Sequence, residues 1–193
     1  MGSQEFHKSL YVVGPSSTGK TTLCNAVAKK LHLNENAVVG EVARHVMATQ
    51  GYTRKDVGSL EMQQAIMDAH LQRENEGRMG AVRLCDRSAI DPIVYAVLTA
   101  PNAEEAKRRQ DILVHSPLFQ LALQGYRDSI FLLLAPVPEW VVDDGVRLIE
   151  SQARCHDIFK TVLRELDIAF RELGPEMRFL EERIMAVMGM LRL

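Results

Sequence analysis

A run near the start of the chain combines glycines, a lysine and several hydroxyl residues, which are the residue types that bind phosphate. The run is Gly14-Pro15-Ser16-Ser17-Thr18-Gly19-Lys20-Thr21-Thr22, and it matches the spacing G-x-x-x-x-G-K-[ST]. In this spacing the glycines let the backbone curl, so that successive N–H groups converge on a phosphate. The start of the following helix adds about half a positive charge at the same point. The sequence therefore predicts that Gly14 to Thr22 bind the phosphates of a nucleotide.

Side chains in and beyond this run suit a metal–nucleotide complex. Lys20 can reach the β- and γ-phosphates, and the hydroxyl of Thr21 is placed to ligate Mg²⁺. Asp86 follows the apolar run Val82–Cys85, so its carboxylate can hold the same ion through water or accept a proton from a substrate hydroxyl. The alternative is that Asp86 caps the helix beginning near Ile90. ATP and Mg²⁺ are the predicted cofactors, with Lys20 and Asp86 as catalytic candidates.

The residues after Asp86 help to separate the classes of phosphate-loop protein. A GTPase usually carries [NT]-K-x-D to read guanine, and this tetrapeptide does not occur in the chain. An ATPase commonly has a glutamate directly after the aspartate to activate water, whereas Arg87 and Ser88 follow here. Arg87 can orient a substrate or a phosphate. These features favour phosphoryl transfer to a small-molecule acceptor over hydrolysis.

Two arginines later in the chain are placed to serve the transferred group. Arg147 and Arg154 are seven residues apart, so both lie on one face if the segment is helical. Their charge would then stabilise the moving phosphoryl group as a short lid closes. The alternative is a solvated helix in which Glu150 pairs with Arg154. We predict Arg147 and Arg154 as catalytic residues of a lid.

Polar residues that follow the second predicted strand mark the acceptor side. Ligands of open α/β sheets bind beyond the carboxyl ends of the strands, which is where Glu41 and Arg44 fall. Glu41 can accept hydrogen bonds from a sugar diol, and Arg44 can meet a phosphate or a carbonyl; surface ion pairing is the alternative. A further polar set is expected to form a solvated helix face rather than to contact a base: Gln63, Gln64, Asp68 and His70.

Short apolar runs alternate with longer amphipathic stretches, which indicates βα units feeding a parallel sheet. Strands are predicted at Leu10–Val13, Ala37–Val39, Val82–Cys85, Ile130–Leu134 and Ile168–Arg171. Helices are predicted at Lys20–Leu31, Leu60–Gly77, Asp91–Leu98, Ala103–Val114, Glu150–Leu166 and Glu176–Leu191. The predicted fold class is α/β: a three-layer P-loop NTPase fold with a five-stranded parallel sheet, helices on both faces and a short lid.

Length and composition indicate one ordinary domain. The chain has 193 residues, of which 47% are hydrophobic and 25% charged, so one core is expected over residues 7–193. Residues 1–6 resemble a remnant of cloning. A net charge of −2 gives no broad field for nucleic acid or anionic lipid, so neither is an expected partner.

The cysteines and the hydropathy of the chain indicate the cellular compartment in which the protein is expected. The 3 cysteines are an odd number without CxxC spacing, which favours a reducing cytoplasm. No apolar run approaches the ~20 residues that cross a bilayer, and no signal-peptide pattern is present, so no membrane association is expected. The expected partner is a small-molecule phosphate acceptor. Monomer and homodimer both stay open.

Three segments together resemble a known family: the phosphate loop, the block Glu41-Val42-Ala43-Arg44, and the stretch from Pro138 through Trp140 to Arg147. The chain is similar to the P-loop kinase domain that phosphorylates nicotinamide riboside in bifunctional bacterial regulators of NAD salvage, often classed as an AAA-type ATPase domain. The likeness runs from about Leu10 to Leu191. It implies that Gly14 to Thr22 bind the triphosphate, that Arg147 and Arg154 serve the lid, and that Glu41 with Arg44 lie near the acceptor.

The chain departs from that family in two respects. These 193 residues include no adenylyltransferase domain. In addition, Asp86-Arg87-Ser88 looks more like the acidic-Arg-Ser/Tyr signature of deoxynucleoside and thymidylate kinases.

The leading hypothesis is Mg·ATP-dependent phosphoryl transfer to a hydroxyl of a nucleoside-like acceptor, with Arg87 among the substrate-binding residues. The alternative is a nucleotide-dependent regulatory or binding module whose lid signals to a partner. A kinase acting on a nucleic-acid end is disfavoured, because phosphate contacts along a strand usually need a basic stripe.

Overall fold

The core of the molecule is a five-stranded parallel sheet. We describe it from a computed structural model of the chain, which describes residues 8–76, 82–140 and 151–191. The strand order is β2-β3-β1-β4-β5, and every neighbouring pair is parallel. The strands are β1 (Lys8–Val13), β2 (Val38–Val39), β3 (Val82–Asp86), β4 (Ile130–Leu134) and β5 (Phe170–Leu173).

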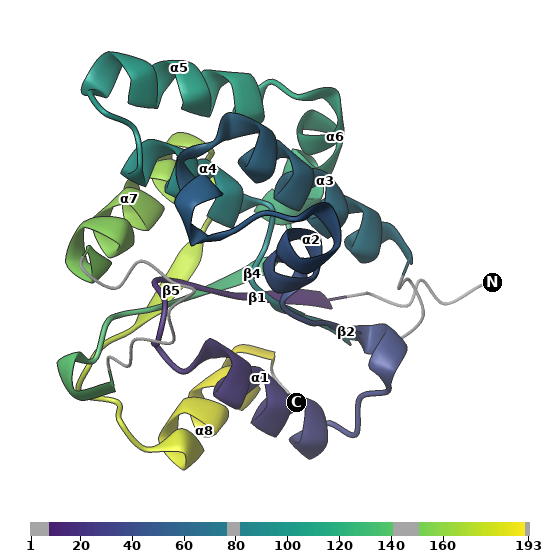
Figure 1. The fold of residues 1–193 in the computed structure, drawn as a ribbon. Helices are drawn as coiled ribbons and strands as arrows, with labels where there is room; N and C mark the ends of the chain where they lie inside the picture. The colour runs from purple at the N-terminus through teal and green to yellow at the C-terminus, as the bar shows by residue number, and fades with distance from the viewer. Residues whose placement is uncertain (1–7, 77–81, 141–150, 192–193) are drawn as a thin grey trace.

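Helices cover both faces of this sheet, as Figure 1 shows. One face carries α1 (Lys20–Lys30) and α8 (Leu180–Leu191). The other face carries α2 (Val42–Gln50), α3 (Leu60–Glu76), α4 (Ile90–Leu98), α5 (Ala103–Val114), α6 (Pro117–Arg127) and α7 (Gln152–Glu165). Three short 3₁₀ segments join them: Glu35–Ala37, Arg54–Gly58 and Pro138–Trp140.

The alternation of side chains along β1 explains why the sheet needs two covering layers. Leu10 and Val12 pack with the residues of α1 and α8, whereas Tyr11 and Val13 pack with those of the larger helical layer. All four side chains are at most 2% exposed. A strand that is apolar on both faces is stable only between two layers, which is the three-layer arrangement observed.

A buried polar cluster joins the larger helical layer to the sheet. The carboxylate of Glu74 on α3 accepts hydrogen bonds from the hydroxyls of Tyr11, at 3.0 Å, and Tyr126, at 2.9 Å. Tyr126 in turn accepts a hydrogen bond from the backbone N–H of Ala89 at 3.2 Å. Burial raises the pKa of Glu74 to about 7, against the opposing effect of both tyrosine hydrogen bonds. The cluster ties the loop after β3 to the core.

The predicted fold class and the five strands are confirmed, with several differences in the elements. The helices α2 and α6 were not predicted. The last strand begins at Phe170 rather than Ile168, because Asp167 and Ile168 close the end of α7 through backbone bonds to Arg164 and Leu163.

The last helix begins at Leu180 rather than Glu176, because a turn at Gly174–Arg178 precedes it. Among the helices of the described residues, none has the length and apolar character needed to cross a membrane.

Candidate active site

The loop between β1 and α1 curls around the start of α1. Gly14 has φ 138° and Gly19 has φ 83°, both in the region that favours glycine. A Cβ atom on Gly14 would lie 2.6 Å from the carbonyl oxygen of Leu134 on β4, so no side chain fits there. The loop therefore passes tightly over the end of β4 and delivers its backbone to the N-terminus of α1, where a phosphate is favoured.

Lys20 lies inside this loop and is 5% exposed. Its Nζ donates to the carbonyl oxygen of Pro15 and to Oγ1 of Thr18, the latter at 3.2 Å. The ammonium group thus lies where the loop's carbonyl and hydroxyl oxygens converge. A phosphate bound in the loop would offer it stronger, charged acceptors in their place.

A hydroxyl and a carboxylate meet beside the loop. Oγ1 of Thr21 donates to Oδ2 of Asp86 at 2.6 Å. The other oxygen, Oδ1, is buried and has no hydrogen-bond partner among the described residues. These are the oxygen ligands that Mg²⁺ prefers. No group of three or more His, Cys, Asp or Glu in the described part of the chain could hold a metal ion.

The next residue, Arg87, is held in an uncommon conformation. Its φ is 81°, although it is not glycine, and its side chain is buried. Its backbone N–H donates to the carbonyl oxygen of Val12 at 3.0 Å. Its Nη1 donates to Oδ1 of Asp91 at 2.8 Å, and its Nε lies 3.5 Å from Oε1 of Glu41. Such backbone strain persists where the surroundings over-determine it, often at functional sites.

Arg87 separates two pockets and lines both. The first pocket lies over the phosphate loop and is lined by Ser17 to Thr22, Arg87 and Trp140. The second lies among α2, α3 and α4 and holds about 600 Å³ of empty space, its open mouth included.

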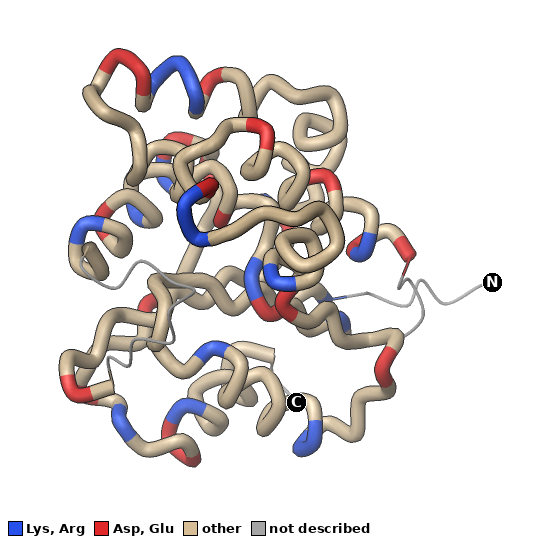
Figure 2. Tube along the Cα trace, viewed as in Figure 1, with Lys and Arg blue, Asp and Glu red and all other residues tan. Residues whose placement is uncertain are grey.

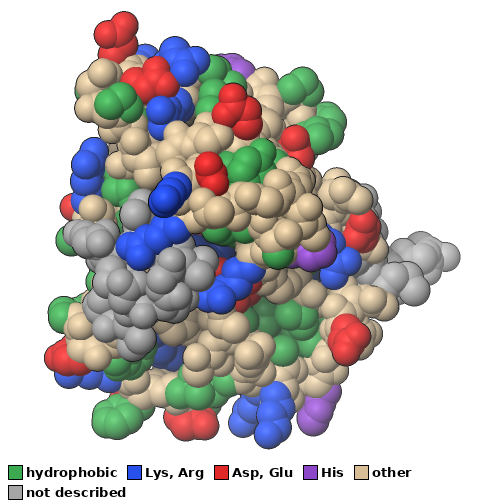
Figure 3. Space-filling model, in the orientation of Figure 1, with side chains coloured by type: hydrophobic (Ala, Val, Ile, Leu, Met, Phe, Trp, Pro, Cys, Tyr) green, Lys and Arg blue, Asp and Glu red, His purple; other side chains and the backbone are tan. Residues whose placement is uncertain are grey.

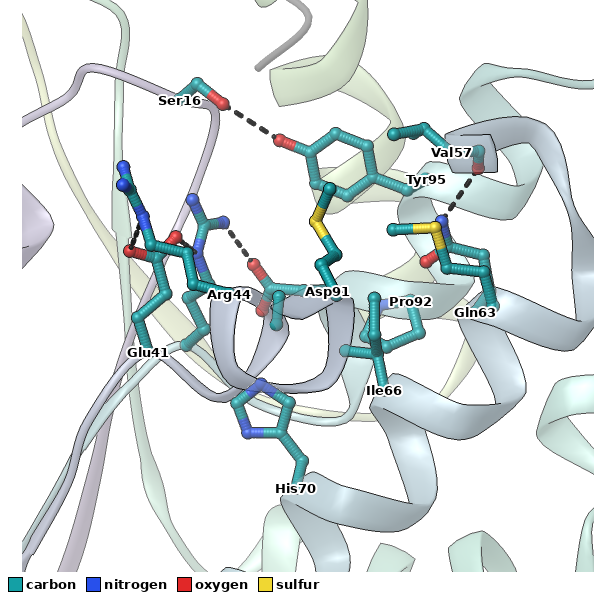
Figure 4. A pocket seen from close by; sticks show the side chains of 14 residues that line it. Ser16, Glu41, Arg44, Val57, Gln63, Ile66, His70, Asp91, Pro92 and Tyr95 are labelled. Carbon is teal, nitrogen blue, oxygen red and sulfur yellow. Dashed lines mark hydrogen bonds and ion pairs between the residues drawn. The ribbon is translucent and has the colours of Figure 1, made fainter. Parts of the chain in front are cut away.

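The second pocket has a charged side and an apolar side (Figure 4). Glu41, Arg44, Arg87 and Asp91 form the charged side, and Arg44 Nε lies 2.9 Å from Oε2 of Glu41. The remaining lining comes from Ser16, Ala43, Met47, Val57, Met62, Gln63, Ile66, His70, Pro92 and Tyr95. An apolar cavity with a few convergent polar groups is typical of a small-molecule site.

Burial changes the pKa values of His70 and Asp91, which line this pocket. Burial lowers the pKa of His70 to about 3, and the positive charge of Arg87 lowers it further. The imidazole is therefore neutral. Burial also raises the pKa of Asp91, although the Arg87 guanidinium opposes the rise.

Contacts from distant elements hold the phosphate loop in place. Gln152 on α7 donates to the carbonyl oxygen of Ser16 at 2.7 Å, and the hydroxyls of Ser16 and Tyr95 lie 3.2 Å apart. On the other side, Nη1 of Arg183 donates to the carbonyl oxygen of Thr18 at 2.8 Å. The Arg183 guanidinium also lies over the Trp140 ring, 4.6 Å from its centroid. Side chains from α4, α7 and α8 thus fix the position of the phosphate loop.

The predicted site residues fall into three groups. Ser17 to Thr22 line the pocket over the phosphate loop, and Asp86 is bonded to Thr21 beside it. Gly14 and Pro15 begin the same loop. Ser16, Glu41, Arg44 and Arg87 line the pocket among α2, α3 and α4, the candidate acceptor pocket. Arg154 is exposed on α7, and no contact places it at either pocket. Arg147 lies outside the described residues.

The expectation of a solvated polar face on α3 was wrong for two residues. Gln63 and His70 are buried and line the acceptor pocket, at 3% and 0% exposure. Their spacing of seven residues, two helical turns, is the signal that could have paired them. Gln64 and Asp68 are half-buried and hydrogen-bonded to each other at 2.9 Å.

The sequence-based prediction also missed Asp91, Tyr95, Gln152 and Arg183. Asp91 lies four residues after Arg87, a spacing that could have suggested their ion pair. Tyr95, Gln152 and Arg183 contact the phosphate loop from positions far along the chain, and no local sequence pattern reveals such contacts.

Charges of both signs are interspersed along the chain and over the face seen in Figures 2 and 3.

Comparison with known proteins identifies the family. A family model described as an AAA domain matches residues 9–183. The chain belongs to this AAA domain family. The resemblance inferred from the sequence is confirmed by NadR protein in complex with NAD and AMP-PNP, which matches with a TM-score of 0.71 and 24% identity, over 97% of this chain and 50% of the NadR chain. The AAA domain described here thus spans about half the length of NadR.

Two further structures share the fold of this AAA domain. Deoxyadenosine kinase from M. mycoides with bound dATP matches with a TM-score of 0.68 and 17% identity, over 97% of this chain and 100% of that one. Shikimate kinase from Acinetobacter baumannii in complex with shikimate matches with a TM-score of 0.51 and 16% identity, over 97% and 94%. No curated protein matches significantly. The chain therefore has the fold of a P-loop kinase.

Proposed function

We propose that this protein transfers the γ-phosphoryl group of Mg·ATP to a hydroxyl group of a small, nucleoside-like acceptor. The observation that carries the proposal is the position of Arg87, which lines both the phosphate-loop pocket and the pocket among α2, α3 and α4. Two ligands bound in these pockets would meet at one guanidinium. That arrangement suits transfer between two bound molecules, for which positioning and charge supply most of the catalysis.

On the donor side, the loop backbone would hold the phosphates, and Lys20 would exchange its contacts with Pro15 and Thr18 for phosphate oxygens. Thr21 and Asp86 would hold Mg²⁺, which neutralises charge on the β- and γ-phosphates when bound. Arg87 would contribute positive charge between the two ligands. Each group acts on charge that develops during transfer.

On the acceptor side, Glu41 is the better candidate for the base than Asp86. Glu41 lines the acceptor pocket. Asp86 instead accepts a hydrogen bond from the Thr21 hydroxyl and does not line that pocket. The acceptor hydroxyl would give its proton to the Glu41 carboxylate as its oxygen bonds to the γ-phosphorus. The bond between that phosphorus and the β–γ bridging oxygen breaks, and ADP leaves.

The lid remains part of the proposal. Arg147 and Arg154 would meet the γ-phosphoryl group after a closure brought about by the acceptor. For Arg154, which is exposed on α7, such a contact requires movement. Arg154→Ala should then lower kcat more than it weakens ATP binding, because the contact forms late; an equal loss in both would remove Arg154 from the mechanism.

Incubating the purified protein with Mg²⁺, γ-labelled ATP and a panel of phosphate-free sugar-bearing acceptors tests the proposal. The panel includes NR, whose pyridinium ring is cationic, since NadR was solved in complex with NR, together with the uncharged ribonucleosides and deoxyribonucleosides. Label should appear on one class of acceptor and disappear in the Lys20→Ala variant, with Lys30→Ala as an exposed control on the same helix. Release of labelled inorganic phosphate at the same rate with and without every acceptor would contradict transfer. That result would favour a nucleotide-dependent regulatory module, the alternative function.

A regulatory module would make a cytoplasmic partner, rather than a metabolite, the second ligand. For the kinase that we propose, a cytoplasmic location follows from the supply of ATP. Whether it acts as a monomer or a homodimer would be read from the same preparation by light scattering.

A further inference from the structure

His70 has no role in the transfer step, yet it is a buried polar side chain at the acceptor pocket. It lies on α3, is 0% exposed and lines the pocket. Within residues 8–76, 82–140 and 151–191, neither of its ring nitrogens has a hydrogen-bond partner. Buried polar groups are almost always paired, and an unpaired one carries its full desolvation penalty. His70 therefore points to a group that binds beside it.

The chemistry of the ring limits what that group can be. The imidazole is neutral, because burial lowers its pKa to about 3. A neutral imidazole has one N–H donor and one bare nitrogen acceptor. A hydroxyl group matches this ring because it can donate to the bare nitrogen or accept from the N–H. An ionised phosphate or carboxylate can only accept, so it would match the N–H of this ring but not its bare nitrogen.

The position of His70 places that hydroxyl close to the reacting group. Figure 4 shows His70 on the side of Glu41 and Asp91, and Gln63 across the pocket beside Val57. The charges of Arg87 and Glu41 act on His70, which agrees with this placement. The hydroxyl that is phosphorylated must approach Glu41 and Arg87, so His70 would meet a neighbouring part of the same molecule.

The charged residues of the pocket indicate that this part of the acceptor is uncharged. Glu41 pairs with Arg44 and Arg87, and Asp91 pairs with Arg87. Two guanidiniums thus face two carboxylates, which leaves no net charge to bind an anion. A phosphomonoester would need a surplus of positive charge here.

We propose that His70 selects the acceptor by hydrogen bonding to a sugar hydroxyl other than the one that is phosphorylated. The acceptor accordingly carries no phosphate group and has at least two hydroxyls on its sugar, as a ribonucleoside does and as distinct from a nucleoside monophosphate. This inference rests on the proposed kinase function and names the substrate class and a specificity-determining residue for it.

Matched acceptors that differ by one hydroxyl test the inference. The wild-type protein should use the best ribonucleoside-type acceptor with a kcat/KM about 10-fold or more above that of its 2′-deoxy or its 3′-deoxy analogue, since a site built to pair with a hydroxyl discriminates against its absence. In His70→Phe, which keeps a ring but cannot pair, that ratio should fall towards one. His70→Gln, which keeps a donor and an acceptor, should retain part of the ratio. His45→Phe, at an exposed position on α2, is the matched control and should keep the wild-type ratio.

Several results would overturn the inference. A wild-type ratio near one for both analogues would do so without any variant, and therefore even if His70→Phe fails to fold. An unchanged ratio in a folded His70→Phe protein, with equal losses on both acceptors, would show that the ring only supports the pocket wall. Preference for a nucleoside monophosphate over the nucleoside would contradict an acceptor without a phosphate group. Absence of label on every acceptor would instead refute the kinase proposal itself, and the His70 inference with it.

Discussion

Oγ1 of Thr21 donates a hydrogen bond to Oδ2 of Asp86 at 2.6 Å, which joins the first turn of α1 to the end of β3. The second oxygen of Asp86 is buried without a partner among the described residues. We propose this pair as the Mg²⁺ site, because both groups offer oxygen ligands beside the phosphate loop.

Replacing Asp86 by Asn should therefore weaken the use of Mg²⁺. We expect kcat/KM to fall by about 100-fold at low Mg²⁺ and to recover in part as Mg²⁺ is raised, since an amide is a poorer ligand than a carboxylate. The measurement is a Mg²⁺ titration of the transfer rate. Asp157→Asn, at an exposed site on α7, should follow the wild-type curve. Parallel curves for Asp86→Asn and the wild type would exclude Asp86 from the metal site.

Arg87→Lys should impair transfer more than ATP binding. Lysine keeps the charge but cannot contact Asp91 and Glu41 with a planar fork, so the groups of the acceptor pocket lose their alignment. We expect kcat to fall by about 100-fold with a much smaller change in the KM for ATP, measured by steady-state kinetics. Arg108→Lys changes an exposed pair with Glu105 and serves as control. Near-wild-type kcat in Arg87→Lys would show that geometry at this position is unimportant.

Gly14→Ala should disrupt the conformation of the phosphate loop. Its Cβ would lie 2.6 Å from the Leu134 carbonyl oxygen, at a φ of 138° that alanine rarely adopts. We expect loss of nucleotide binding in calorimetry together with a lower melting temperature. Gly125→Ala on α6, where a Cβ meets nothing within 4 Å, should instead raise the melting temperature. Tight nucleotide binding by Gly14→Ala would be incompatible with the described loop.

Glu74 should make the stability of the fold depend on pH. Its folded pKa of about 7 exceeds the ordinary value of 4.5, so the folded state binds the proton more tightly than the unfolded state. This contribution is fully present below pH 4.5 and is lost as pH rises through 7, an expected change of about 3 kcal/mol in the free energy of unfolding.

Chemical denaturation at pH 4.5 and pH 8 measures this change. Glu74→Gln should reduce the loss of stability between the two values, because glutamine does not ionise. Glu76→Gln on the same helix, at an exposed position, should leave it as in the wild type. Equal losses in both variants would assign the pH dependence to other groups.

The curled loop of the proposed nucleotide site was predictable from sequence because it is local. Gly14 to Thr22 follow one strand and open one helix, so the spacing alone defines the curled loop. Asp86 could be added because it directly follows an apolar run.

The acceptor pocket was only partly predictable because it assembles from distant parts of the chain. Glu41 comes after β2, which has two residues, and meets Arg87 only because β2 and β3 are neighbours. His70 and Gln63 look like surface residues in the sequence. They are buried because α3 is packed between α2 and α4, which leaves its polar side chains facing a pocket instead of solvent.

Phosphorus NMR of the protein with Mg·ATP and the acceptor selected by the labelled panel tests the central claim most directly. We predict one new phosphomonoester signal that grows in step with ADP, one molecule for one molecule, while inorganic phosphate stays constant. ADP formed together with inorganic phosphate, and no phosphomonoester, would contradict the claim that this site transfers phosphate between two bound molecules.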